Sequence, residues 1–440
     1  MRPTCILTTA DRPWQSVPAP RAVAAESQPD LRITGDEGAT WRGFGGCFNE
    51  LGWVALGHLP AADRDALLDD LFAPGGELGF TFCRLPIGAN DYSLDWYSHD
   101  EHPGDFAMER FSIARDERDL LPYIRAALAR NPDITLFASP WSPPTWLKSP
   151  PVYNYGTLIA DAAHYDAYAR YFVRFVQAYA AAGVTVHQIH VQNEPVSSQK
   201  FPSCVITGPE FARFIGGHLA PAFAAAGVTA EIWLGTINGP ETDDRKWWTT
   251  YHHYAGLVLE DPAARAAIRG IAYQWAGKHA LQITRLGHPE LPLIQSENEC
   301  GDGSNSWRHA WYVADLIHHY LINDVVAYVY WNMVLEPGGR STWGWNQNTL
   351  VTVDPVTGAA VRNPEWHVMR HYAAIRPGDR RLRCERPWAT SSVAFRGTDG
   401  LTVVVRNPYP HHRTVTIAAA GRTWAVDLPA ESLATLRLPG

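Results

Sequence analysis

The chain has 440 residues, of which 46% are hydrophobic, so it can bury a large core and does not have the composition of a disordered protein. It carries 37 Lys and Arg against 45 Asp and Glu, a net charge of −8, and no block of basic residues. This charge pattern disfavours nucleic acid and anionic membranes as partners. We therefore expect a compact globular protein whose ligand is not a polyanion.

The first residues, MRPTCILTTADRPWQ, lack the apolar stretch of an export signal, and no run of about 18 apolar residues follows them. The sequence therefore predicts no membrane span and a cytoplasmic location, unless a signal has been lost by truncation. The six Cys stand singly without a CxxC pair, which favours free thiols over a disulfide framework.

Aromatic residues are abundant, with 18 Trp, 18 Tyr and 15 Phe. Core packing is the default explanation for any single Trp. Several Trp together in loops, however, would supply flat apolar platforms with a polar rim, which suit the faces of sugar rings. The Trp that lie beside Gly, Pro, Asn or Ser are Trp141, Trp146, Trp275, Trp331, Trp343 and Trp345.

Residues 1–40 contain two short strand-like segments, at 5–9 and 31–34. Isolated short strands are unstable, so we expect this segment to pair with a β-domain at the other end of the chain.

Residues 41–377 alternate short apolar runs with longer amphipathic stretches, such as 161–182 and 209–226, a pattern typical of βα units around a parallel sheet. Eight such units are what a (β/α)8 or TIM barrel requires. A doubly wound dinucleotide-binding sheet would need a GxGxxG turn, and the GFGGCF segment does not have that spacing. The expected strands span 43–48, 80–86, 134–139, 186–192, 230–236, 270–274, 292–296 and 325–330.

Residues 378–440 change to short alternating strands separated by turn residues, which predicts an antiparallel β-sandwich. The expected fold is thus an α/β TIM barrel at 41–377 with a side β-sandwich at 378–440, joined by the strands of 1–40. The expected sandwich strands span 391–396, 401–406, 413–418, 423–428 and 432–438.

Two acidic residues stand at the ends of predicted barrel strands, where the functional groups of TIM barrels lie. Glu194 follows the fourth strand and Glu297 ends the seventh, and these strands lie across the barrel from each other. Hydrolysis of a glycosidic bond needs two carboxyl groups, one to protonate the departing oxygen and one to attack the anomeric carbon or activate water. The gap between them, which decides between retention and inversion, is left open by the sequence.

Each acidic motif has a simpler explanation when taken alone. Asn-Glu-Pro is most often a turn or a helix start, because Pro favours the first helical turn and acids suit helix N-termini. Glu299 lies two residues after Glu297, and in an extended segment both side chains would point to the same side. Either residue could therefore be the catalytic carboxylate at the end of the seventh strand.

From about Arg42 to Asp354 the chain resembles glycoside hydrolase family 30, whose best-known members are the glucosylceramidases. Several long motifs occur in the order that the family has. They are GFGG (43–46), RLPIGANDYS (84–93), LFASPWSPPTWLK (136–148), the YARYFVRFVQAYA helix (168–180), VQNEP (191–195), SENEC (296–300) and YWNMVLEPGG (330–339).

The resemblance implies a (β/α)8 barrel with a side β-sandwich, retention of anomeric configuration and no cofactor. It assigns Glu194 as the general acid/base and Glu297 as the nucleophile, and it favours Glu297 over Glu299 because Ser-Glu matches the family's order. The charge of Glu297 is expected to raise the pKa of Glu194, which must start protonated. Candidate substrate-binding residues are Arg84, Asp91, Trp141, Asn193 and Trp331, together with the loop tryptophans Trp275 and Trp345.

Two of these candidates have defined expected roles. Arg84 is expected to keep the nucleophile ionised and oriented, with a purely structural ion pair as the alternative. Asp91 is expected to contact sugar hydroxyls, with a turn-forming Asp after Asn90 as the alternative.

One departure from the family concerns the end of the sixth strand. Where the glucosylceramidases carry His-Trp-Tyr, this chain reads Gln274-Trp275-Ala276, so the tyrosine hydroxyl that supports the nucleophile and lines the aglycone side is missing. The departure weakens the case for ceramide-type specificity more than the case for the reaction.

We therefore expect a retaining hydrolase of a neutral β-linked glycoside, either a small molecule or an oligosaccharide. The candidate activities include β-glucosidase, glucosylceramidase, β-1,6-glucanase, β-xylosidase and β-fucosidase. No metal site is expected, because the His-His pairs at 252/253, 318/319 and 411/412 lack an HExxH spacing or a Cys partner. The alternatives are a sugar-binding barrel without catalysis and a separate sugar-binding module after residue 378.

Overall fold

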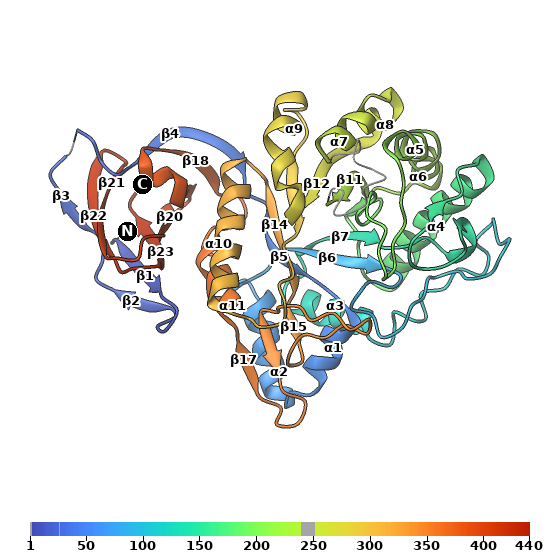
Figure 1. The fold of residues 1–440 in the computed structure, drawn as a ribbon, viewed down its shortest axis with the longest axis horizontal. Coiled ribbons are helices and arrows are strands. Elements are labelled where there is room, and N and C mark those ends of the chain that lie inside the picture. The colour runs from blue at the N-terminus through green and yellow to red at the C-terminus, as the bar shows by residue number, and fades with distance from the viewer. Residues whose placement is uncertain (1, 26, 239–250) are drawn as a thin grey trace.

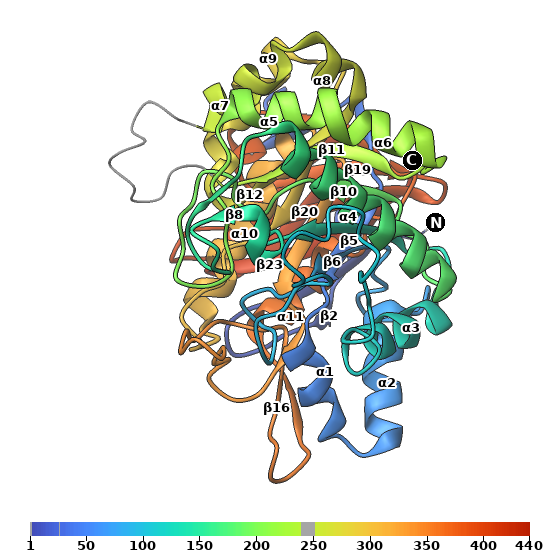
Figure 2. The ribbon, with the colours of Figure 1, turned by 90° about the vertical axis from the view of Figure 1, so that its right-hand side faces the viewer.

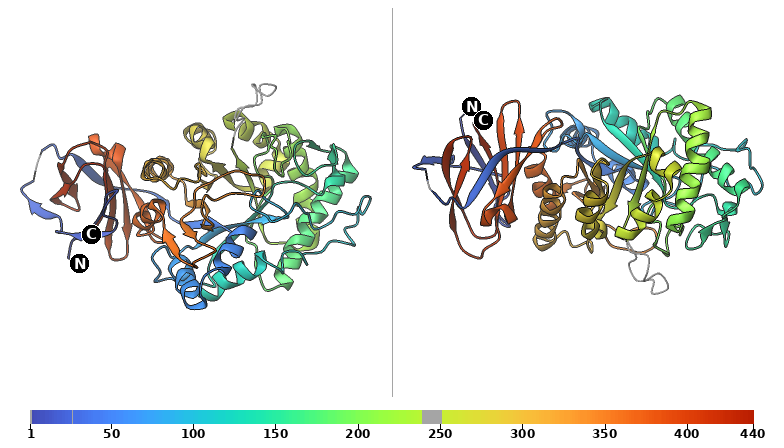
Figure 3. Two further views of the ribbon diagram at one scale, coloured as in Figure 1. Left: turned by 60° about the horizontal axis from the view of Figure 1, so that its bottom comes forward. Right: turned by 90° about the horizontal axis from the view of Figure 1, so that it is seen from above.

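The computed structural model describes residues 2–25, 27–238 and 251–440, except for the side chains of 251–253. The molecule consists of a closed barrel and a β-sheet domain beside it (Figures 1 and 3). Both ends of the chain lie in the β-sheet domain. The barrel is therefore formed by one continuous segment of the chain, which lies between the two parts of the sequence that form the β-sheet domain.

Eight parallel strands close the barrel in the order β10-β11-β12-β13-β14-β5-β6-β7. Each corresponds to one of the eight strands expected from the sequence, so the (β/α)8 fold is confirmed. The strands are β5 (Gly43–Cys47), β6 (Phe82–Ile87), β7 (Thr135–Pro140), β10 (Gln188–His190), β11 (Glu231–Ile237), β12 (Ile268–Gln274), β13 (Leu293–Glu297) and β14 (Ala327–Asn332).

Glycine fixes the close approach of the first barrel strand to its neighbours. A Cβ atom at Gly45 would overlap the carbonyl oxygen of Phe82 on β6, and one at Gly46 would overlap the side chain of Met333. Gly43 has a φ of +143°, which side chains other than glycine rarely adopt. The GFGG segment is thus a tightly packed strand of the barrel wall.

Helices surround the strands, with α1 to α3 below them and α5 to α9 above them in Figure 2. The long helix α4 begins after Asp161, whose side chain accepts a hydrogen bond from the amide of His164, and α10 begins in the same way after Ser306. The helices are α1 (Glu50–Gly57), α2 (Ala61–Phe72), α3 (Leu120–Arg130), α4 (Ala162–Ala181), α5 (Gly208–Phe214), α6 (Ala220–Ala226), α7 (Tyr251–Leu259), α8 (Pro262–Ala267), α9 (Leu281–Gly287), α10 (Trp307–Ile322) and α11 (Pro364–Tyr372).

The β-sheet domain is a single ten-stranded sheet in the order β2-β1-β23-β20-β19-β18-β4-β21-β22-β3. Strands from both ends of the sequence contribute to one buried core, which includes Leu7, Val403, Ile417 and Trp424. Its strands are β1 (Thr4–Thr8), β2 (Gln15–Val17), β3 (Arg21–Val23), β4 (Leu31–Thr40), β18 (Arg380–Glu385), β19 (Ser392–Gly397), β20 (Gly400–Asn407), β21 (Arg413–Ala419), β22 (Arg422–Leu428) and β23 (Ser432–Leu438).

The first and last segments of the chain are joined in this sheet. β1 pairs with β23, and β4 lies between β18 and β21. The pairing of β4 with β21 is parallel and the other pairings of this sheet are antiparallel. The expected domain boundaries, 40/41 and 377/378, stay a prediction.

Five short strands form two small sheets in the segments that follow the barrel strands β7 and β14. β8 (Lys148–Ser149) pairs with β9 (Thr157–Leu158), and β16 (Val351–Val353) joins β15 (Val334–Leu335) to β17 (Ala360–Arg362). Among the described helices, none has the length and apolarity needed to cross a bilayer. The six cysteines all lie within the described residues and form no disulfide bond.

Candidate active site

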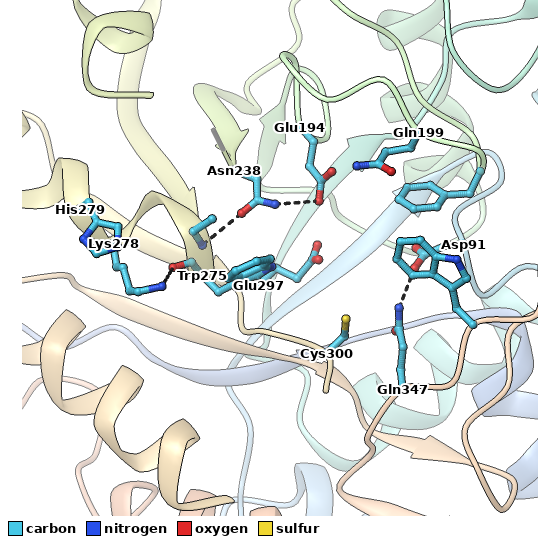
Figure 4. Close-up of a pocket in the computed structure, with 13 residues that line it drawn as sticks. Asp91, Glu194, Gln199, Asn238, Trp275, Lys278, His279, Glu297, Cys300 and Gln347 are labelled. Atoms are coloured by element: carbon cyan, nitrogen blue, oxygen red, sulfur yellow. Dashed lines mark hydrogen bonds between the residues drawn. The ribbon is translucent and has the colours of Figure 1, made fainter. Parts of the chain in front are cut away.

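A cavity of about 580 Å³ lies at the carboxyl ends of the barrel strands. Glu297 is the last residue of β13, Asn238 follows β11, and Trp275 follows β12. Glu194 and Glu297 both project into this cavity (Figure 4). The full lining is Asp91, Glu194, Gln199, Phe201, Asn238, Trp275, Ala276, Lys278, His279, Glu297, Cys300, Trp345 and Gln347.

Glu297 is held at the base of the cavity by two donors. Its Oε2 atom forms an ion pair with Nη1 of Arg84, and it also accepts a hydrogen bond of 3.0 Å from Nε2 of Gln274. Glu297 is only 8% exposed. A hydrogen bond from a cation to a carboxylate favours the ionised form, so Glu297 is placed as an anion beside the cavity.

Arg84, on β6, is the centre of the polar network beneath the cavity. Its Nε and Nη2 atoms donate to Oγ of Ser139 at 3.0 and 2.8 Å, and Nη2 also donates to Oδ1 of Asn193 at 2.7 Å. Oγ1 of Thr236 lies 3.3 Å from the same Nη2. The guanidinium is fully buried, and its donors are directed to oxygen atoms at the ends of several strands.

Two tryptophans pack against the same guanidinium. The Cζ atom of Arg84 lies 4.3 Å from the ring centroid of Trp141 and 5.7 Å from that of Trp331. The two indole rings are 5.5 Å apart at an interplanar angle of 31°. These rings exclude water from the ion pair, which strengthens its electrostatic interaction.

Glu194 lies in a strained turn after β10. Its φ is +46°, a left-handed conformation that is costly for a residue with a Cβ atom. Its amide donates to the carbonyl of Thr236 at 2.9 Å, and its Oε1 atom accepts a 3.3 Å hydrogen bond from Nδ2 of Asn238. The strained backbone therefore aims the carboxyl group into the cavity and places it beside a neutral amide.

Asp91 is the third acidic group in the cavity wall, beside Glu194 and Glu297. Burial raises its pKa from 3.8 to about 6. Gln347 presents its amide to Asp91, with Nε2 at 3.5 Å from Oδ2. The carbonyl oxygen of Gln347 accepts from Nε1 of Trp331 at 2.8 Å and from Nδ2 of Asn332 at 3.0 Å, which fixes the orientation of that amide.

One wall of the cavity is formed by the 3₁₀ helix Trp275–Ala280. Nζ of Lys278 lies 5.4 Å from the ring centroid of Trp275 and donates to its carbonyl oxygen at 3.3 Å. Partial burial lowers the pKa of Lys278. Figure 4 shows Lys278 and His279 on the side of the cavity across from Gln199 and Asp91. This wall is polar, and Ala276 leaves it without a tyrosine hydroxyl.

The opposite wall carries an aromatic pair. The rings of Phe201 and Trp345 meet edge to face with centroids 5.4 Å apart. Nζ of Lys200 lies 4.8 Å from the centroid of Trp345. Trp345 thus offers an apolar surface at the side of the cavity, as expected for a loop tryptophan that contacts a sugar ring.

The structure brings five of the predicted site residues to the cavity surface and leaves four beneath it. Arg84, Trp141, Asn193 and Trp331 are at most 3% exposed and contact one another below Glu297. Their direct contact with substrate stays a prediction. The five at the surface are Asp91, Glu194, Trp275, Glu297 and Trp345.

Glu299 lies apart from the cavity that holds Glu194. It lines a neighbouring cavity of about 590 Å³ together with Asp302, His309 and Tyr312. Glu297, which ends β13, is therefore the acid of the SENEC segment that shares a cavity with Glu194.

Sequence reasoning gave no site role to several polar residues, among them Asn238, Gln347 and Gln274, the last of which it noted only as a departure from the family. Gln274 ends β12 and Asn238 follows β11, so the rule that located the two glutamates would also have located these amides. Gln347 lies in a loop and has no comparable signal in the sequence.

Within the described residues, no group of three or more His, Cys, Asp or Glu side chains is arranged to hold a metal ion. The side chains of residues 252 and 253 lie outside the described residues.

A closed parallel barrel with two carboxyl groups in one cavity at the carboxyl ends of its strands is the arrangement of barrel glycoside hydrolases. A family model described as the glycosyl hydrolase family 30 TIM-barrel domain matches residues 41–375. The chain belongs to glycosyl hydrolase family 30, and the resemblance read from its motifs is confirmed.

Relatives with two different names resemble this chain. "Putative glucosylceramidase 4" of Caenorhabditis elegans is 29% identical over 389 residues, which cover 82% of this chain and 73% of that protein. "Endo-1,6-beta-D-glucanase neg1" of Aspergillus fumigatus is 26% identical over 432 residues, which cover 90% of this chain and 84% of that protein. Among solved structures, SrfJ from Salmonella typhimurium is 25% identical, with a TM-score of 0.88 over 100% of both chains.

Proposed function

We propose that the protein is a retaining β-glycoside hydrolase with Glu297 as its nucleophile and Glu194 as its general acid/base. The observation that carries this proposal is the placement of both carboxyl groups in one cavity with different partners. Glu297 is paired with the guanidinium of Arg84, whereas Glu194 accepts from the neutral amide of Asn238. A cationic partner suits a nucleophile that must stay ionised, and a neutral partner is compatible with an acid that must start protonated.

The first step would form a covalent glycosyl-enzyme ester. An oxygen of Glu297 attacks the anomeric carbon, the bond to the leaving oxygen breaks, and Glu194 transfers its proton to that oxygen. Formation of the ester removes the negative charge of Glu297. Glu194 can then remain ionised and act as a base in the next step.

The second step would release the sugar. Glu194 removes a proton from water, the water oxygen attacks the anomeric carbon, and the ester bond to Glu297 breaks. Two inversions at the same carbon give net retention. Asp91 and Trp345, which line the cavity near these groups, are suited to bind the hydroxyls and one face of the sugar.

The proposed substrate is a neutral β-linked glucoside with a polar aglycone. Relatives named as a glucosylceramidase and an endo-1,6-β-glucanase both support a β-glucosyl group. Lys278 and His279 on one side of the cavity and Gln199 on the other give its outer part polar groups, which fit a second sugar better than a ceramide. We therefore favour a β-1,6-linked glucoside, with β-xylosides and β-fucosides as alternative substrates.

Azide rescue tests the two roles separately. Glu194→Ala should hydrolyse a 2,4-dinitrophenyl β-glucoside slowly, and added azide should accelerate it and give the β-glucosyl azide, because the nucleophile is intact. Glu297→Ala should lose nearly all turnover, and azide should give the α-glucosyl azide by direct displacement. Proton NMR of the product distinguishes the two anomers.

Glu299→Gln is the matched control, because Glu299 belongs to the same SENEC segment but lines a different cavity. It should keep wild-type turnover. Full activity of Glu297→Ala would contradict the assignment. Sugar binding by the wild-type protein without any product release, measured by calorimetry and NMR, would instead support a binding protein on the same barrel.

A further inference from the structure

Gln274 is a buried amide at the end of β12, surrounded by oxygen atoms from three other strand ends. Its Nε2 atom lies 2.8 Å from Oδ1 of Asn193, 3.0 Å from Oε2 of Glu297 and 3.1 Å from Oγ1 of Thr236. Its side chain is fully buried. An ionised carboxylate only accepts hydrogen bonds, so the NH₂ group of Gln274, not its carbonyl oxygen, must face Glu297.

The backbone of Gln274 is also anchored. The hydroxyl of Tyr320, on α10, donates to the carbonyl oxygen of Gln274 at 2.5 Å. This contact lies on the outer side of the barrel strand, because Tyr320 belongs to a surrounding helix. The hydrogen bond from Tyr320 therefore fixes the backbone of Gln274, and the side-chain amide faces Glu297 at the base of the cavity.

Gln274 and Arg84 share three acceptors. Both donate to Oε2 of Glu297, to Oδ1 of Asn193, the residue before Glu194, and to Oγ1 of Thr236. Two donors that approach one carboxylate oxygen from different strands fix the rotation of that carboxylate. Arg84 supplies a positive charge, and Gln274 supplies a neutral donor that approaches the carboxylate from another strand.

We propose that Gln274 is a positioning residue for the nucleophile, which keeps Glu297 in the orientation for attack through a hydrogen bond whose donor does not titrate. The inference rests on the proposed function. The glucosylceramidase-like pattern has a histidine at this position, and an imidazole would change its charge between about pH 5 and 8. The amide of Gln274 donates to Glu297 without such a change.

The charged and titratable groups around this hydrogen bond come from several elements. Arg84 on β6 forms the ion pair with Glu297, and Tyr320 on α10 donates to the backbone carbonyl oxygen of Gln274. The remaining groups that face Glu297 or share its cavity are Asp91, Glu194, Lys278, His279, Cys47 and Cys300. Substitution of Gln274 leaves all of these groups in place, so a change in the pH profile reports on the lost hydrogen bond.

The test compares Gln274→Leu with the wild-type protein on 2,4-dinitrophenyl β-glucoside. This leaving group needs no proton, so kcat/KM reports on attack by Glu297 and not on Glu194. We expect kcat/KM to fall about 10- to 100-fold, as for the loss of a hydrogen bond to a charged group. The acid limb of its pH profile should move to higher pH, because removal of a donor to the carboxylate raises the pKa of Glu297.

Two further variants separate positioning from packing. Gln188→Leu is a matched control, since Gln188 is a buried glutamine at the start of β10 whose amide contacts Glu231. It should leave kcat/KM and the acid limb unchanged. Gln274→His restores a donor to Glu297, so it should recover at least part of kcat/KM at neutral pH and add an imidazole ionisation to the profile.

The inference is overturned if folded Gln274→Leu keeps the wild-type kcat/KM and acid limb, or if it changes only thermal stability, the result that we expect for Gln188→Leu. The proposed function fails separately, through wild-type turnover by Glu297→Ala. An inactive Glu297→Ala together with a fully active Gln274→Leu would retain the function and reject the positioning role.

Discussion

The guanidinium of Arg84 and the carboxylate of Glu297 form an ion pair at the base of the cavity, although the two residues are 213 positions apart in the chain. The side chain of Arg84 is fully buried and that of Glu297 is 11% exposed. Removal of one partner from such a pair leaves an uncompensated buried charge. The same contact is therefore expected to support both the closed barrel and the ionised nucleophile.

Arg84→Met should lower the free energy of unfolding by about 3 to 5 kcal/mol, the range for breaking a buried ion pair. Its kcat/KM should also fall, since the pKa of Glu297 would rise without its cationic partner. Arg84→Lys should have a stability and a kcat/KM between those of the wild type and Arg84→Met, because an ammonium keeps the charge but loses the planar set of donors. Urea unfolding at pH 7 and kcat/KM over a pH series measure the two effects.

Arg125→Met is the control for this prediction, because Arg125 forms an exposed pair with Glu117, with side chains 43% and 46% exposed. Its cost should stay below about 1 kcal/mol. Equal stability losses in the Arg84 and Arg125 variants would show that the buried ion pair contributes no more to the free energy of unfolding than an exposed one.

Asp91 provides a pH-dependent prediction. Burial raises its pKa to about 6, so the carboxylate that would accept sugar hydroxyls becomes protonated as the pH falls through 6. KM should therefore rise below pH 6 in the wild-type protein, and this rise should be absent from Asp91→Asn, whose KM is high throughout. The measurement is KM for an aryl β-glucoside at half-unit intervals from pH 4.5 to 7.5.

The same shift has a consequence for stability. The pKa of Asp91 is higher in the folded protein than the unfolded value of 3.8, so its contribution to stability is complete below pH 3.8 and is lost as the pH rises through about 6. Asp91→Asn should therefore be more stable than the wild type at pH 7, by up to about 3 kcal/mol, and similar to it at pH 3.5. An equal difference at both pH values would contradict a raised pKa.

The barrel was predictable because a strand buried on both faces leaves a continuous apolar run in the sequence. All eight runs correspond to strands, with shifts of a few residues at their ends. The side domain was predicted less completely. β18 has the sequence RRLRCE, in which Leu382 is buried and the other positions are exposed or half-buried, so this single strongly apolar position gave little signal. β2 and β3 are three-residue edge strands whose formation depends on their partners.

The two acidic residues were predictable because strand ends can be located in the sequence, and Glu194 and Glu297 lie at two of them. The burial of Arg84 between two tryptophans was not, because it depends on the way strands far apart in the chain converge. The role of Gln274 was not predicted for a different reason. It stood out only as a departure from the family, and its value as a donor depends on three oxygens from other strands.

Ala276 is a small residue in the lining of the cavity. It lines the wall next to Trp275 and replaces a residue with a large side chain in the glucosylceramidase-like pattern. Ala276→Tyr should raise KM several-fold for a β-1,6-linked glucose disaccharide, because the ring would occupy space needed by the second sugar. It should affect a small aryl β-glucoside much less. Ala266→Tyr, an exposed position on α8, is the control and should change neither value. A uniform effect on both substrates would place residue 276 outside the aglycone region.

Lys148 connects two loops at the cavity. Its ammonium is buried and donates to Oγ of Ser142 at 3.0 Å and to the carbonyl oxygens of Val152, Tyr153 and Ser203 at 2.7, 2.9 and 2.6 Å. The first three acceptors lie in the loop after β7, and Ser203 lies in the loop after β10. The second loop also carries two residues of the cavity wall, Gln199 and Phe201.

Lys148→Met keeps most of the side chain but removes the ammonium, which leaves these carbonyl oxygens without their donor. Buried unsatisfied polar groups cost about 1 to 3 kcal/mol each, so we expect a loss of at least about 2 kcal/mol in the free energy of unfolding. We also expect a larger KM, because the loop after β10 would no longer be fixed against the loop after β7. The chemical step should change little, since the four acceptors of Lys148 lie in these loops and do not include Glu297. A variant with normal stability, or one that loses kcat while KM is unchanged, would show that the ammonium does not hold the cavity wall.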